Sequence, residues 1–297
     1  GTVRSQMGDA LVVQSIGGGG GVADTVHAGL EVDEFNNLIE GELPEKGGAF
    51  TLAIGGRGGE GSDGGAVHVE HTGAIQAGGE ARAGATLQSI GGGGGMGGIA
   101  STYYQTSTIA PGAQLQVSMA VGGKGGAGGA GGSVTWRQGE TATTTATGAL
   151  GDAVRLQSIG SGGGVAGGVA VGAEVSEDGT TARMDVALIN INGSAGDGGK
   201  GGTVKATNEQ NSTLYTSGEG GIGLVAQSIG GGGGLVQAVY KQTIDKTTIN
   251  LGGGNGNGGL VDITQSGNIY TAGNAAHGIL AQSIGGGGGA AGSAGTF

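Results

Sequence analysis

The sequence contains no cysteine and only two prolines, and its aromatic residues are limited to three Phe, one Trp and five Tyr. The absence of cysteine excludes disulfides and thiolate metal sites, and it is compatible with passage through an oxidising compartment. A collagen helix needs abundant proline and a glycine at every third position, and the chain has neither, despite its 80 glycines. Collagen is therefore excluded. The shortage of aromatic side chains predicts a thin, aliphatic core.

Positive charge and long apolar runs are also scarce. The formal net charge is −11, and the twelve Lys and Arg are scattered singly, so we expect no nucleic-acid partner. No apolar run of about 18 residues occurs, and the first residues do not read as a signal segment. We therefore expect neither direct membrane insertion by this segment nor an export signal of its own.

One motif, Gln-Ser-Ile followed by a glycine run, recurs along the whole chain. Its five copies are Gln14-Ser15-Ile16, Gln88-Ser89-Ile90, Gln157-Ser158-Ile159, Gln227-Ser228-Ile229 and Gln282-Ser283-Ile284. Successive glutamines are 74, 69, 70 and 55 residues apart. Self-similarity at such spacing is typical of a repeat architecture. We expect one solenoid fragment with a partial repeat (1–21), four repeats (22–95, 96–164, 165–234 and 235–289) and a tail (290–297), excised from a longer array.

A second glycine-rich block lies in each repeat, and 23 to 25 residues separate its last glycine from the next motif. In this constant stretch, apolar and polar residues alternate as in a half-buried strand, for example at Val134 and Trp136. Three short strands within about 25 residues predict one coil of a parallel β-helix with glycine-rich corners. At two or three coils per repeat, about twelve coils would make a rod of about 60 Å. The other part of each repeat, from the glycine run of the motif to the second glycine block, varies in length. It contains the acidic stretch from Val32 to Lys46, which we expect to project from the coil.

The motif residues are expected to be structural. We expect the isoleucine to point inward and the glutamine and serine to hydrogen-bond the backbone of the corner. Five successive glycines exceed the needs of one corner, so the runs could instead form polyglycine II segments that hydrogen-bond to one another. Whether Gln88 and Gln157 form a ladder depends on the number of coils per repeat.

Candidate chemistry is sparse. His68 and His71 are three residues apart, so on a strand they face opposite sides and cannot bind zinc together; we expect both at the surface. Ser161 interrupts a glycine run with no histidine near it in sequence. The stretch Gly58-Gly59-Glu60-Gly61-Ser62-Asp63 starts like a calcium-binding nonapeptide, but two equivalent blocks lack aspartate, which argues against calcium binding. A threonine array for ice binding would have to recur in every copy, and Thr141 to Thr147 does not. We expect no catalytic, cofactor or metal site.

The run Ala281-Gln282-Ser283-Ile284-Gly285, with the strand pattern before it, resembles the repeats of very large autotransporter passenger regions from Gram-negative bacteria. The resemblance covers all four repeats and implies a right-handed parallel β-helix exported through the outer membrane to the cell surface or beyond. The family includes adhesins, proteases and esterases, so the resemblance indicates fold and location better than activity. We expect a non-catalytic structural or adhesive role, with host surfaces, neighbouring cells, extracellular matrix or glycans as partners and self-association as an option. Two alternatives remain open: a polysaccharide-active enzyme on a β-helix scaffold, and a phage tail fibre or self-assembling filament.

Overall fold

The computed structural model describes residues 1–28, 31–32, 38–39, 49–106, 115–175, 185–236, 246–251 and 253–291. Within these ranges the secondary structure is β throughout, with no helix, as expected for an all-β chain. Accordingly, the described residues include no helix long and apolar enough to cross a membrane. Most of the stretch from Val32 to Lys46, expected to leave the coil, lies outside the described residues.

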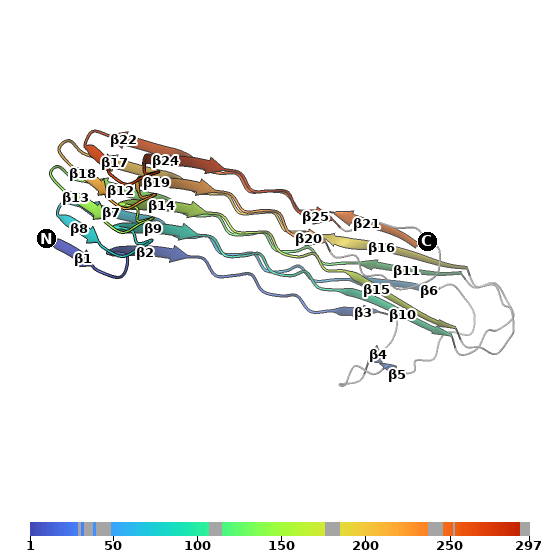
Figure 1. The fold of residues 1–297 in the computed structure, drawn as a ribbon. Helices are drawn as coiled ribbons and strands as arrows, with labels where there is room; N and C mark the ends of the chain where they lie inside the picture. The colour runs from blue at the N-terminus through green and yellow to red at the C-terminus, as the bar shows by residue number, and fades with distance from the viewer. Residues whose placement is uncertain are drawn as a thin grey trace.

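Three sheets form the near end of the molecule, where the N-terminus lies (Figure 1). The corner sheet consists of β1 (Thr2–Ser5), β8 (Ala74–Ala77), β13 (Thr143–Ala146), β18 (Thr213–Thr216) and β23 (Asn268–Thr271). The motif sheet consists of β2 (Leu11–Ile16), β9 (Ala85–Ile90), β14 (Val154–Ile159), β19 (Ile222–Ile229) and β24 (His277–Ile284). The valine sheet consists of β7 (Val67–His71), β12 (Val134–Gln138), β17 (Val204–Asn208) and β22 (Val261–Gln265).

Two further sheets form the far end. One contains β6 (Ala49–Ile54), β11 (Leu115–Val121), β16 (Asp185–Ser194) and β21 (Lys246–Leu251), and the other β3 (Val26–Ala28), β10 (Ala100–Thr106) and β15 (Val169–Val175). Two short pairs complete the set, β20 (Leu235–Val236) with β25 (Ala290–Ala291) and β4 (Glu31–Val32) with β5 (Leu38–Ile39). Only the β4–β5 pair is antiparallel among the described strands, and all others are parallel.

Each strand pairs with its counterpart in the next repeat. Gln157 lies opposite Gln88 on one side and Gln227 on the other, and each of the three repeats between residues 22 and 234 contributes one strand to each of the five main sheets. The expected two or three coils per repeat, and the rod of twelve coils, are therefore wrong. One repeat is one long, flat layer, because its glycine runs extend the chain between the near and far sheets, and the layers stack in sequence order (Figure 1).

The expectation that the glycine runs form the corners is also wrong. The glycine runs lie along the straight stretches between near and far sheets (Figure 1). At the near-end turns, residues other than glycine take up the left-handed conformation: Ala81, Thr141, Leu150, Asn211 and Ala275 have φ between 52° and 64°. Only Gly220, with φ of 66°, is a glycine among the positive-φ residues of the described chain. The long glycine runs thus serve the straight part of each layer, whereas single glycines such as Gly148 and Gly218 lie in the near-end turns, where an added Cβ would overlap a carbonyl oxygen of a neighbouring layer.

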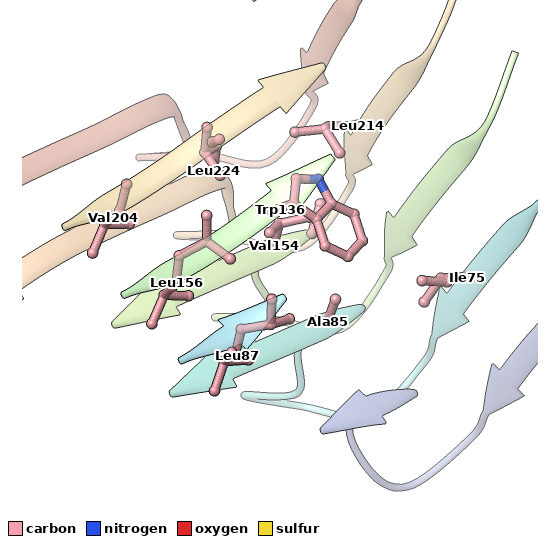
Figure 2. Close-up of a cluster of buried hydrophobic side chains, with 14 residues drawn as sticks. Ile75, Ala85, Leu87, Trp136, Val154, Leu156, Val204, Leu214 and Leu224 are labelled. Atoms are coloured by element: carbon pink, nitrogen blue, oxygen red, sulfur yellow. The ribbon is translucent and has the colours of Figure 1, made fainter. Parts of the chain in front are cut away.

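The main core lies between the three near sheets (Figure 2). Trp136, Leu87, Leu156 and Leu214 are fully buried there. Alternation along the strands places these side chains inside, as the period-2 pattern of the valine sheet predicted: Val134 and Trp136 are buried, and Arg137 between core positions is exposed. A smaller core at the far end contains Ala53, Ala100, Ala120 and Val169.

Candidate functional site

The repeated motif and its glycine runs form the most regular feature of the molecule. We call the runs that follow the motif the outgoing arms (17–25, 91–99, 160–168, 230–234 and 285–289). The second glycine blocks are the return arms (55–66, 122–133, 193–203 and 253–260). Outgoing arms lead from the motif sheet toward the far end, and return arms lead back to the valine sheet (Figure 1).

The backbone of the outgoing arms follows a three-residue period. The N–H groups of Gly94 and Gly97 donate to carbonyl oxygens of the next outgoing arm, and that of Gly91 donates to the Ile159 carbonyl oxygen at the end of β14, over 2.9 to 3.1 Å. Those of Gly92, Gly95 and Gly98 donate to carbonyl oxygens of a return arm, each over 2.8 Å. The amides of Gly93 and Met96 donate to no described backbone acceptor. The glycine runs therefore hydrogen-bond to one another, as expected, and three residues per turn is the repeat of a polyproline II helix.

In the turn formed by Gly93, Gly94 and Gly95, two of the three positions have no room for a side chain. A Cβ added at Gly94 would overlap the carbonyl oxygen of Gly126 in a return arm, and one at Gly95 would overlap that of Gly21. The third position points outward: a Cβ at Gly93 would have only the Ser161 hydroxyl within 4 Å, at 3.8 Å. Close approach of neighbouring backbones thus explains the long glycine runs.

The motif serine ties the two arms together. Ser158 is fully buried, its Oγ donates to the carbonyl oxygen of Gly132 over 2.8 Å, and it accepts from the N–H of Gly202 over 2.7 Å. Ser89 and Ser228 make the equivalent pairs of bonds. Ser15 and Ser283 make one each. The serine therefore hydrogen-bonds backbone, as expected, although the backbone belongs to the ends of two return arms.

Replacing Ser158 by alanine is expected to lower the free energy of unfolding by about 2–3 kcal/mol, because a buried carbonyl and a buried N–H both lose their partner. Urea denaturation followed by circular dichroism measures the change. Ser161→Ala is the matched control, because Ser161 lies in the following outgoing arm and is only partly buried. The control should stay within about 0.5 kcal/mol of the parent. Equal losses in the two variants would contradict the bridging role.

The motif glutamines form a ladder along the stack. Each Nε2 donates to the Oε1 of the next layer, over 2.5 Å from Gln14 to Gln88, 2.6 Å to Gln157, 2.7 Å to Gln227 and 2.6 Å to Gln282. The expectation that the glutamine bonds corner backbone is wrong. The inward isoleucine is wrong as well: Leu87 and Ser89 are fully buried, so Gln88 and Ile90 alternate to the outer face.

The two histidines of β7 face opposite sides of their strand, as the spacing predicted. His68 is exposed, whereas His71 is partly buried and stacks on Trp136, with ring centroids 5.9 Å apart. His71 Nε2 lies 3.3 Å from the carbonyl oxygen of Thr143, and desolvation by burial lowers its pKa. The surface expectation for His71 is therefore wrong. The side chain belongs to an inner polar row that continues with Gln138, which donates to the carbonyl oxygens of Ala142 and Thr213.

The carboxylates singled out for calcium serve the layers instead. Asp63 Oδ1 accepts the N–H of Ala130 in the next layer over 2.7 Å, and Glu60 pairs with Arg57. Asp197 likewise accepts the N–H of Gly254 over 2.7 Å. Among the described residues, no group of three or more His, Asp or Glu is arranged to hold a metal ion.

Sequence reasoning did not identify the inner polar row or the Asp9 and Asp152 turn contacts. Asp9 accepts the N–H of Ala83 and the hydroxyl of Thr86, and Asp152 pairs with Arg155 over 2.6 Å. The matching Gly-Asp-Ala sequences at both aspartates are a signal that could have indicated a shared structural role.

Comparison with protein-family models, curated proteins and solved structures finds no significant match.

Proposed function

We propose that the chain is a non-catalytic structural segment of a bacterial surface protein. In this proposal it is a right-handed parallel β-solenoid whose glycine arms form a polyglycine II layer. It belongs to the passenger region of a large autotransporter exported through the outer membrane of a Gram-negative bacterium. Its function is to provide a stiff stalk that holds adhesive regions away from the cell.

The proposal rests on the hydrogen bonds that the motif side chains make between layers. Gln157 bonds the glutamine of the layer on each side, and Ser158 joins the return arms of two layers. The most repeated residues are thus engaged in holding one repeat to the next. A protein whose repeated groups bond neighbouring repeats gains stability with each repeat added, which suits a load-bearing stalk.

Force spectroscopy tests the mechanical part. The chain is placed between two marker domains and pulled from its ends. We expect discrete rupture events, with increments near one repeat, or about 250 Å of released chain for roughly 70 residues at 3.6 Å each. Smooth extension without rupture events would contradict a stalk.

The location is tested on cells of the source bacterium with an antibody against this chain. We expect labelling of intact cells, equal to that after permeabilisation. Labelling that requires permeabilisation would contradict the proposed surface location, without bearing on the mechanical result.

A further inference from the structure

The outward face of the outgoing arms carries a patch of exposed apolar side chains. The motif isoleucines form one row along the stack, with Ile16 exposed by 65% in the first layer and Ile90, Ile159 and Ile229 partly exposed. Six residues further on, a second row contains Val22, Met96, Val165 and Leu235. Met96 and Leu235 lie in inner layers and are still 46% and 53% exposed. Rows of exposed apolar side chains of this kind indicate an interaction site.

Between the two apolar rows lies a row made only of glycine: Gly19, Gly93, Gly162, Gly232 and Gly287. Packing does not require glycine there, because an added Cβ would come no closer than 3.5 Å to its nearest neighbour at any of the five. The N–H groups of this row donate to no described acceptor. The row is therefore a shallow trough with hydrogen-bond donors in its floor.

The return arms carry a different surface at their own outward positions. Arg57, Glu60, Asp63, Lys124, Asp197 and Lys200 are exposed there. The same backbone arrangement therefore accepts charged side chains on one side of the glycine layer and bears aliphatic side chains around bare glycine on the other. The charged surface of the return arms favours solubility. The aliphatic surface of the outgoing arms has no partner within a single chain.

We propose that the face formed by the glutamine, isoleucine, glycine and aliphatic rows binds a second copy of this chain. The two copies are related by a two-fold axis parallel to the stack. Strand and polyproline II rises place the glutamine row about 7 Å before the isoleucine row and the glycine row about 9 Å after it. Each glutamine row can then lie over the glycine row of the other copy, while the two isoleucine rows pack together in the centre.

This arrangement satisfies the polar groups that it covers. A glutamine Oε1 has two lone pairs, and the ladder uses one of them, so the other can accept an N–H from the glycine row. Layers of both copies repeat at the same ~4.8 Å, so the match continues along the stack. The face measures about 25 Å by 20 Å, or roughly 500 Å² on each copy, which brings the pair to about 1,000 Å². That total is at the lower limit for a specific interface and predicts a weak, reversible dimer.

Sedimentation velocity over a wide range of protein concentration tests the proposal, and we expect a monomer–dimer equilibrium. Ile90→Lys with Ile229→Lys should weaken the dimer at least about tenfold, because charges replace apolar side chains at the centre. Gly93→Met with Gly162→Met should weaken it similarly by filling the trough, although these changes make the face more apolar. Ala127→Lys, at an outward position of a return arm, is the control and should leave the equilibrium unchanged.

Three results would overturn the inference: a wild-type chain that stays monomeric, a dimer that survives both pairs of substitutions, or a dimer strengthened by the glycine-to-methionine pair. The last would indicate unspecific apolar association. Circular dichroism checks that each variant is folded, and the methionine pair keeps the test open if the lysine pair does not fold. The dimer inference rests on this surface alone, so its failure would leave the proposed stalk function intact.

Discussion

Replacing Gly94 by alanine is expected to destabilise the chain by about 3 kcal/mol or more, because overpacked backbone has to move apart. The added Cβ would overlap the Gly126 carbonyl oxygen and lie 2.6 Å from the Gly164 nitrogen. Both neighbours are backbone atoms held by hydrogen bonds of their own, so neither can move aside alone. Thermal and urea unfolding followed by circular dichroism measure the loss.

The adjacent Gly93 provides the matched control. Its outward position leaves an added Cβ at ordinary contact distance, 3.8 Å from the Ser161 hydroxyl. Gly93→Ala should therefore be neutral or stabilise by up to about 1 kcal/mol, because alanine restricts the unfolded chain. Similar losses at the two positions would show that the arms are not packed with the three-residue period described above.

The second large effect is expected at Trp136, the largest fully buried side chain. Trp136→Ala should lower the free energy of unfolding by about 3–5 kcal/mol, through lost burial and the cavity left behind. The equivalent residue in the next layer, Ala206, is small, so the surrounding side chains cannot readily fill the space. The indole N–H also donates to Asn208 Oδ1 over 3.3 Å, and that acceptor would lose its partner.

Arg137→Ala is the control on the same strand. Arg137 is exposed and pairs with Glu70 and Glu209 at the surface, so its loss should change stability by no more than about 1 kcal/mol. Urea denaturation is followed by circular dichroism for both variants. Tryptophan fluorescence cannot be compared, because Trp136→Ala removes the only tryptophan. A Trp136→Ala loss as small as that of Arg137→Ala would contradict the core packing described here.

Local structure was predictable from the sequence. The three short strands expected in the constant stretch are present, for example as β12, β13 and β14. Alternation of apolar and polar residues identified the inner face of the valine sheet. These features depend on neighbouring residues in the chain, and the period-2 pattern records them directly.

The arrangement of the repeats was less predictable. The repeat length gives the spacing of equivalent residues but does not give the number of circuits that it contains. Leu87 and Ile90 are both apolar and face opposite sides, so the pattern around the motif left its orientation open. The inward place of Ser89 becomes understandable only once the return-arm glycines lie opposite it. Contacts across 24 and 43 residues carry that information.

Residue-resolved hydrogen exchange by NMR tests the central claim, the three-residue hydrogen-bonding period of the glycine arms. In the second outgoing arm, we expect the amides of Gly91, Gly92, Gly94, Gly95, Gly97 and Gly98 to be protected. Those of Gly93 and Met96 should exchange fast, because they donate to no described backbone acceptor. Uniformly fast exchange along the arm, or protection that alternates every second residue as in a strand, would contradict the account.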